Sequence, residues 1–266
     1  MYKNFPIKSK YDLNDLLKIM EILRGPEGCP WDREQNHKTI KANFLEEVYE
    51  TMEAIENDDT EGLKEELGDV LLQIVFHSQM SDEAGEFDFY DVADGICKKL
   101  ILRHPHVFGN TIAETADVVL NNWDSIKKEE KGYQSITDTL KSVPTTFPGL
   151  MKAAKVGKRA AKAGFDWPDV TGAVDKIYEE TKELEQIIGS GTKEELTDEL
   201  GDILFSVVNV SRYLDIDPEE AILLSTGKFI KRFEIVEKLA SKKKLEMKQA
   251  SIEELTVLWE EAKKRL

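Results

Sequence analysis

The sequence has little cysteine and no long hydrophobic run. Its 266 residues include two cysteines, Cys29 and Cys97, so a disulfide framework is not expected and the composition fits a reducing cytoplasm. No apolar stretch approaches the roughly 18 residues of a membrane-spanning helix, and the first residues lack the apolar core of a signal peptide. We therefore expect a cytoplasmic protein with no membrane partner.

Positive charge is scarce relative to negative charge. The chain carries 36 lysine and arginine residues against 52 acidic residues, so its formal net charge is −16. This charge disfavours nonspecific binding to nucleic acid or to an anionic membrane. It leaves room for a small phosphorylated substrate, because bound divalent cations reverse the local field. We expect no nucleic-acid partner.

The sequence also lacks any convincing run of alternating apolar and polar residues that would form a sheet. Apolar residues recur at helical spacing instead, and the 8 prolines fall between the periodic segments. The pattern predicts an all-α fold. Helices are expected over residues 12–24, 38–57, 61–84, 88–103, 114–131, 147–163, 170–189, 193–214, 217–243 and 251–265.

An internal repeat divides the chain into two halves. Adding 133, half the chain length, to five acidic positions of the first half gives five acidic positions of the second. The matching pairs are Glu46 with Glu179, Glu47 with Glu180, Glu50 with Glu183, Glu66 with Glu199 and Asp69 with Asp202. Residues 132–148, rich in Ser, Thr, Gly and Pro, are the best linker candidate. We therefore expect two tandem helical-bundle domains, over residues 1–131 and 149–266.

The acidic residues of each repeat are spaced to share helix faces. In the second repeat, Glu180 projects with Glu183, and Glu199 projects with Asp202, because residues three apart lie on one side of a helix. A short connection between the two helices favours an antiparallel pair, in which the four carboxylates converge. Like charges this close repel each other. A hard divalent cation would compensate them, so each repeat predicts a metal site.

A glycine stands between the leucine and the aspartate of each acidic pattern. Gly68 and Gly201 both fall inside predicted helices, where glycine costs about 1 kcal/mol relative to alanine. Their presence in both copies indicates that a helix or a ligand approaches closely at these positions.

The repeated pattern, Glu-Glu-x-x-Glu followed about sixteen residues later by Glu-x-x-Asp, resembles that of the all-α nucleoside triphosphate pyrophosphohydrolases. Within them the chain is similar to the two-domain MazG proteins over nearly its whole length. Three segments add to the resemblance: Gly-Cys-Pro-Trp-Asp at 28–32, Arg-His-Pro-His-Val-Phe at 103–108 and Gly-Phe-Asp-Trp at 164–167. The resemblance implies Mg²⁺-dependent hydrolysis of a nucleoside triphosphate between its α and β phosphates, with Mn²⁺ as a substitute ion, by a homodimer.

The resemblance also implies roles for individual residues. The metal ligands of the second repeat would be Glu180, Glu183, Glu199 and Asp202. Those of the first would be Glu47, Glu50, Glu66 and Asp69, while Glu46 and Glu179 stay open as ligands or as partners of ligands. A catalytic and nucleotide-binding cation is implied at Lys176, one turn before Glu180. Further nucleotide contacts are implied at Lys228, Lys231, Arg232 and Trp259.

The two repeats differ in positive charge. At the 133 offset, Lys176 corresponds to Asn43, so the first repeat keeps its carboxylates but lacks this cation. Lys38 and Lys41 remain as residues that could reach the first site from the same helix. Since a triphosphate at the first site would meet less positive charge, we expect the second repeat to carry the hydrolysis.

Two other functions stay open at this point. Glu34 and His37 form a Glu-x-x-His pair of the kind found in di-iron carboxylate bundles. The second repeat contains no histidine, however, so this pair cannot be the shared chemistry. The other alternative is an acidic helical regulator or scaffold with a vestigial metal site, which remains open for the first repeat.

Overall fold

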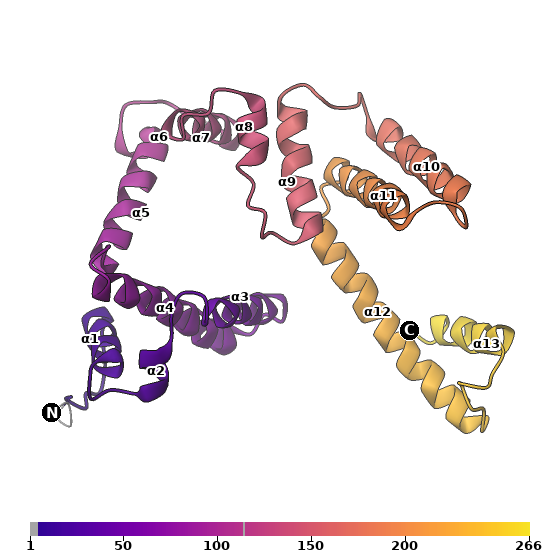
Figure 1. Cartoon of the computed structure of the whole chain (residues 1–266), viewed down its shortest axis with the longest axis horizontal. Coiled ribbons are helices and arrows are strands. Elements are labelled where there is room, and N and C mark those ends of the chain that lie inside the picture. The colour runs from indigo at the N-terminus through magenta and orange to yellow at the C-terminus, as the bar shows by residue number, and fades with distance from the viewer. Residues whose placement is uncertain (1–4, 114) are drawn as a thin grey trace. The chain divides into compact units, whose positions relative to one another are not determined.

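The computed structural model describes residues 5–113 and 115–266, except for the side chains of residues 117, 120, 121 and 124. Within the described residues the chain is helical and contains no strand, so the all-α prediction is confirmed (Figure 1). The helices are α1 (Leu13–Arg24), α2 (Pro30–Glu34), α3 (Lys41–Glu56), α4 (Thr60–Glu83), α5 (Phe89–Arg103), α6 (Pro105–Phe108), α7 (Ala116–Glu130), α8 (Ile136–Lys141), α9 (Gly149–Lys162), α10 (Val170–Ile187), α11 (Lys193–Tyr213), α12 (Pro218–Lys242) and α13 (Ile252–Lys263). No helix in the described ranges has both the length and the hydropathy that a membrane crossing requires.

Side-chain caps fix where several helices begin. Helix α11 starts with a capping box, in which the Thr192 side chain accepts from the backbone N–H of Glu195 and the Glu195 side chain accepts from that of Thr192. Helix α10 starts after Asp169, whose carboxylate accepts from the N–H of Thr171, and α4 starts after Asp59 in the same manner. Such caps satisfy backbone donors that have no partner within the helix. They thereby set which side chains each acidic helix presents to its neighbour.

The chain divides into two compact units, Met1–Lys127 and Lys128–Leu266. In the first unit, α3 and α4 form a helix pair joined by a short turn, and α1 and α5 pack on α4. Its core contains Met20, Ile40, Val75, Phe76 and Met80, which are nearly inaccessible to solvent. Because the core residues of α4 lie in its second half, the first half is left to carry the acidic residues.

The second unit repeats the arrangement of a packed helix pair. Helices α10 and α11 form that pair, α9 packs on α11, and α12 packs on α9 and on α13. Gly157 on α9 allows the close approach to α11, because a Cβ there would lie 2.9 Å from Oδ1 of Asn209. The buried cluster of this unit joins α12 to α13 and consists of Val236, Leu239, Ala240, Leu258 and Ala262.

The segment expected as a linker, residues 132–148, contains helix α8. This helix has its own capping box, formed by Ser135 and Asp138. It packs on α9, where Arg159 donates to Oγ of Ser142 at 2.8 Å and to the carbonyl of Thr139. The serine and threonine residues of this linker candidate serve as caps and hydrogen-bond partners within the second unit.

An arginine fastens the segment before each acidic helix pair, and we call each arrangement an arginine clasp. In the first unit, Arg24 on α1 binds the carboxylate of Glu83 at the end of α4, with Nε at 2.9 Å and Nη2 at 2.7 Å. Its Nη1 also donates to the carbonyls of Asp32 and Gln35. The guanidinium lies 5.3 Å from the ring centre of Phe76.

In the second unit the positions are exchanged: the arginine lies on the second acidic helix, α11, and the carboxylate lies in the segment before the pair. Arg212, near the end of α11, binds Asp166 with Nη1 at 2.8 Å and Nη2 at 2.5 Å. The hydroxyl of Tyr213 lies 2.7 Å from Oδ1 of Asp166 and 2.6 Å from the carbonyl oxygen of Trp167. Both clasps thus tie the chain that leads into the acidic pair to the C-terminal end of its second helix.

Candidate metal centres

Three carboxylates converge between the two acidic helices of the second unit. Oxygens of Glu180 on α10 and of Glu199 and Asp202 on α11 lie within 4.8 Å of one another. The Glu180 residue is only 4% exposed. Oε2 of Glu199 is buried and has no hydrogen-bond partner in the described part of the chain. Buried acceptors without donors are costly, so this group of oxygens fits a cation.

Glu183, the fourth predicted ligand of the second repeat, lies beside this cluster and is not one of the three. Its carboxyl is hydrogen-bonded to that of Glu180. Burial, this hydrogen bond and the charge of Glu199 raise the pKa of Glu183 above its usual value. The Glu183 carboxyl therefore lies directly beside the buried Glu180 and within the electrostatic influence of Glu199.

Lys176 lies at the edge of the same cluster. Its Nζ is 2.8 Å from Oε1 of Glu179 and 2.5 Å from Oε1 of Glu180. Hydrogen bonds to Glu179 and Glu180 raise the pKa of Lys176 well above its usual range. The ammonium group therefore stays charged next to the carboxylates, and Glu179 serves as its partner outside the group of three.

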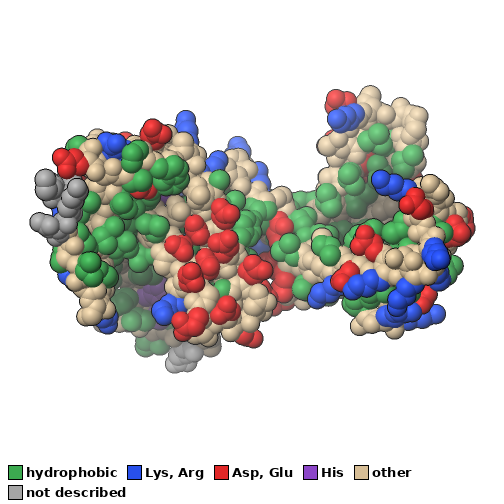
Figure 2. Space-filling view, turned by 90° about the horizontal axis from the view of Figure 1, so that it is seen from below, with side chains coloured by type: hydrophobic (Ala, Val, Ile, Leu, Met, Phe, Trp, Pro, Cys, Tyr) green, Lys and Arg blue, Asp and Glu red, His purple; other side chains and the backbone are tan. Residues whose placement is uncertain are grey.

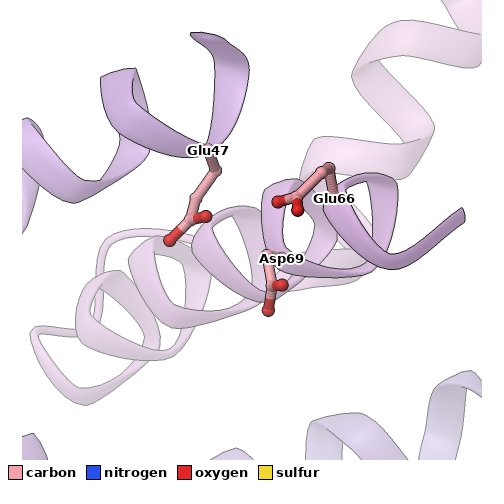
Figure 3. Close-up of side chains that lie close together, drawn as sticks. All are labelled: Glu47, Glu66 and Asp69. Atoms are coloured by element: carbon pink, nitrogen blue, oxygen red, sulfur yellow. The ribbon is translucent and has the colours of Figure 1, made fainter. Parts of the chain in front are cut away.

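The first unit contains a corresponding cluster. Oxygens of Glu47 on α3 and of Glu66 and Asp69 on α4 also lie within 4.8 Å of one another. Figure 3 shows Glu47 extending from one helix and the other two side chains from the facing helix. Burial, followed by the charges of Asp69 and Glu50, raises the pKa of Glu47. Burial and the charge of Glu50 also raise the pKa of Glu66. Glu50 is exposed and, like Glu183, acts from outside the three.

Gln73 on α4 belongs to the surroundings of the first cluster, although sequence reasoning did not identify it. It is hydrogen-bonded to Glu47 and only 7% exposed. Its Oε1 is buried and has no hydrogen-bond partner among the described residues. The spacing to Asp69 was a usable signal, since residues four apart share a helix face.

The donor atoms of both clusters suit a hard divalent cation. Each cluster offers carboxylate oxygens from two helices, and in the second cluster the buried Oε2 of Glu199 has no hydrogen-bond donor among the described residues. Oxygen-only donor sets of this kind are typical of Mg²⁺, Mn²⁺ and Ca²⁺ sites. Neither cluster includes a histidine among the described residues, which disfavours the di-iron alternative.

The close approach expected at Gly68 and Gly201 is not found within the described chain. A Cβ built at either position meets no atom within 4 Å. No other element of the described residues packs over these glycines, so no contact within a single chain requires the absence of a side chain there.

The remaining predicted nucleotide contacts lie on a different helix pair. Lys228, Lys231 and Arg232 are on α12 and Trp259 is on α13. The structure brings two of them together, with the Arg232 guanidinium 5.9 Å from the ring centre of Trp259. The ring of Phe229 lies beside the same tryptophan, at 5.1 Å between centres. Lys228 and Lys231 are exposed, and the carboxylate cluster lies between α10 and α11.

Two copies of a carboxylate-bearing helix pair in a helical chain agree with the class that the sequence resembles, the all-α nucleoside triphosphate pyrophosphohydrolases. Comparison with known families matches residues 35–108 and 169–240 to the MazG nucleotide pyrophosphohydrolase domain. Each range includes one of the two clusters, and the chain therefore belongs to the MazG family, as the motifs predicted.

Individual relatives match along most of the chain. It is 43% identical over 249 residues to the nucleoside triphosphate pyrophosphohydrolase/pyrophosphatase MazG of Thermotoga maritima, covering 94% of each chain. It is 42% identical over 258 residues to the nucleoside triphosphate pyrophosphohydrolase of Escherichia coli, covering 95% of this chain and 97% of that one. The uncharacterized protein YabN of Bacillus subtilis is 44% identical over 263 residues, which is 97% of this chain and 54% of that protein.

Proposed function

We propose that this protein hydrolyses nucleoside triphosphates between the α and β phosphates, releasing a nucleoside monophosphate and pyrophosphate, with Mg²⁺ as the ion and Mn²⁺ as a substitute. The observation that carries the proposal is the convergence of Glu180, Glu199 and Asp202 beside the charged Lys176. The names of the relatives support the same reaction. Control of the nucleotide pool is the cellular role that this reaction would serve.

The residues of the second cluster have different proposed roles in the reaction. A bound divalent cation supplies Lewis acidity at a phosphoryl oxygen and compensates charge, and Glu180, Glu199 and Asp202 would hold it. Lys176 offers a fixed positive charge to the phosphates, because its raised pKa keeps it protonated. Glu183 stands outside the three, next to Glu180, and is proposed to orient the attacking water.

We assign the hydrolysis to the C-terminal domain, residues 149–266. Lys176 has the neutral Asn43 as its counterpart in the first unit, so only the second cluster pairs its carboxylates with this cation. Arg232 and Trp259, which lie together on α12 and α13, are proposed to bind the nucleotide with Lys228 and Lys231. For the N-terminal domain, a supporting role without hydrolysis is the second candidate, favoured by the same missing lysine.

We also propose that the protein acts as a homodimer. Large apolar side chains of the acidic helix pairs and of α12 are exposed in the single chain, among them Leu45, Leu67, Leu200, Leu223 and Leu224. Figure 2 shows broad hydrophobic areas on the visible surface. Contiguous exposed apolar surface marks an interaction site, and a second copy would cover the same faces symmetrically. Sedimentation at micromolar concentration should give a dimer, and a monomer would refute this part.

The central test is product analysis with the purified full-length chain. Nucleoside triphosphates incubated with Mg²⁺ should yield pyrophosphate and monophosphate, resolved by phosphorus NMR. Release of single phosphates instead would show that the cleavage position is wrong. Asp202→Ala should lose activity by orders of magnitude while its helical circular dichroism is retained, since alanine favours helix. Glu194→Ala, at an exposed position in the first turn of the same helix, is the matched control.

A further inference from the structure

A pair of histidines in the first unit takes no part in the proposed hydrolysis. His37, the second member of the Glu34–His37 pattern, lies in the segment before α3, and His77 lies on α4. Their Nδ1 atoms are 2.8 Å apart, and the planes of the two rings are within 11° of parallel. A nitrogen–nitrogen distance this short requires a hydrogen bond, so one Nδ1 is protonated and donates to the other.

The pair attaches a turn to α4. In this turn Oδ1 of Asn36 accepts from the backbone N–H of Thr39 at 3.3 Å, and the backbone N–H of Asn36 donates to Oγ1 of Thr39 at 2.9 Å. The next residue, Ile40, is 2% exposed and packs in the core of the unit. Residues 36–40 thus form an ordered turn that leads directly into α3, and the side chain of His37 connects it to α4.

The immediate contacts of the pair are uncharged. The ring of Phe44 on α3 lies 5.7 Å from that of His77, measured between centres. Oγ of the buried Ser81 on α4 lies 3.5 Å from Nε2 of His37. Burial, followed by the charge of His37, lowers the pKa of His77, and no carboxylate of the described residues acts on it. A second positive charge at the pair would therefore meet no compensating negative charge.

Charged side chains on the neighbouring elements are exposed or have partners of their own. The exposed residues that flank the turn are Glu34, Lys38 and Lys41. The partnered residues are Arg24 of α1 with Glu83 of α4, Glu47 of α3 with Gln73 of α4, and Asp88 with Asp91 in the capping box of α5. The two imidazoles are therefore the groups at this contact whose charge changes near neutral pH.

We propose that the His37–His77 contact is a latch controlled by protonation, which holds residues 36–40 on α4 while at least one of the two imidazoles is neutral. With both protonated, neither Nδ1 can accept a hydrogen bond, and the two positive charges repel each other. The turn then leaves α4, so the start of α3 loosens as the pH falls. The latch depends neither on metal binding nor on the proposed hydrolysis.

The direction of the pH effect follows from the surroundings of His77. Its pKa in the folded chain lies below the usual value of 6.5, which is the value expected when the chain is unfolded. The contact therefore contributes its full stability above the unfolded pKa and loses it as the pH falls through the folded one. Opening of the latch is expected on the acid side of neutrality. The second unit contains no histidine and has no such device.

The test uses NMR of the full-length chain without metal or nucleotide. At about pH 7.5 the imidazole nitrogens should show two different neutral tautomers, one protonated at Nδ1 and the other at Nε2. Amide exchange of Thr39 and Ile40, whose N–H groups are hydrogen-bonded within the turn, is expressed relative to the unfolded rate at the same pH. This protection should fall about tenfold between about pH 7.5 and about pH 5, as for a shift of one pKa unit.

Variants of the pair separate the latch from a general effect of acid. His37→Gln keeps a hydrogen-bonding group and removes one titrating charge, so protection of the turn should change less than about twofold over the same pH range. His77→Gln makes the same test should the first variant fail to fold. His106→Gln is the control, since this histidine lies outside the pair, and it should keep the wild-type response.

Two results overturn the proposal. One is an equal loss of protection in the variants of the pair and in wild type. The other is unchanged protection in wild type at a pH where NMR shows both imidazoles protonated. Pyrophosphate release is scored separately, so its absence would refute the hydrolysis and leave the latch standing.

Discussion

The two carboxylate clusters share one arrangement of three carboxylates, called here the frame, but differ in the side chains beside it. Each takes one carboxylate from the first helix of its pair and two from the second. Beside this frame the second unit places Lys176, in contact with Glu180, whereas the first places the neutral amide of Gln73 against Glu47. The shared arrangement of three carboxylates fits a cation in both units. In the proposed function, the side chain beside them is what distinguishes the cluster that also binds phosphate from the one that does not.

The largest expected effect comes from matched double variants of the two frames. Glu199→Gln with Asp202→Asn should lower pyrophosphate release about 100-fold or more, because the variant can no longer bind the divalent cation that compensates the charge of the phosphates. Glu66→Gln with Asp69→Asn should cause a much smaller loss. Steady-state assays with Mg²⁺ on folded proteins compare the two. A larger loss from the first-unit pair would reverse the assignment of hydrolysis.

Removing the adjacent cation should weaken the substrate interaction of the second cluster. Lys176→Met keeps the length of the side chain and removes its charge, so KM for the nucleotide should rise about tenfold, equivalent to about 1.4 kcal/mol. Lys193→Met, in the first turn of α11, is the control for a general loss of charge. Wild-type kinetics in Lys176→Met would show that its contacts with Glu179 and Glu180 only stabilise the helix.

Amide hydrogen exchange without nucleotide should distinguish the Mg²⁺ dependence of the two acidic helix pairs. Binding of Mg²⁺ stabilises the state that binds it, by about 2.7 kcal/mol at a concentration of 100 times Kd. Lys176 lies beside Glu180 in the second cluster, whereas the neutral Asn43 stands at its place in the first. Because a cation entering the first cluster meets less positive charge, amides of α3 and α4 should become protected at a lower Mg²⁺ concentration than those of α10 and α11. Mass spectrometry of peptides from both pairs measures this order. Protection that begins in α10 and α11 would contradict the proposed difference between the clusters.

The smallest effect concerns acid stability and the two arginine clasps. The hydrogen bond from Arg24 lowers the pKa of Glu83, and that from Arg212 lowers the pKa of Asp166. Because these folded-state pKa values lie below the unfolded ones, each clasp stabilises above the unfolded value and loses this as pH falls through the folded value. Partial exposure limits each contribution to about 1 kcal/mol or less.

Thermal unfolding of wild type and of Asp166→Asn between about pH 6 and about pH 3 measures this contribution. The variant should be less stable than wild type at the upper end, and the difference should shrink as the pH falls. A difference that stays constant with pH would show that the Asp166 charge does not matter for folding.

The parts of the fold that depend on local geometry were predictable from the sequence. The acidic residues that converge were found because a helix places residues three apart on one face, and the 133 offset located both copies. Glu50 and Glu183 were expected to join them and remain adjacent instead. Three residues correspond to about 4.5 Å along a helix axis, so two carboxylates on one face need not reach a common point.

Other features depend on tertiary contacts and could not be read from the pattern. Helices α2, α6 and α8 are too short to show a helical period. Gln73 carries no charge, and its burial and its hydrogen bond to Glu47 appear only in the folded chain. Likewise, Gly68 and Gly201 suggested a close contact, but whether another element covers a glycine is a property of the packed chain.

The arginine clasps have a consequence for the history of the duplicated gene. Arg24 on α1 lies over Phe76 of α4, and at the 133 offset Gly157 on α9 lies against Asn209 of α11. A crossover joining α1 to α11 would bring Arg24 and Arg212 into the same space. The reciprocal product, α9 with α4, would have Gly157 and Gln79 there and no guanidinium at all. Unequal recombination between the two copies would thus produce helix pairs that do not fit, which favours keeping the two copies distinct.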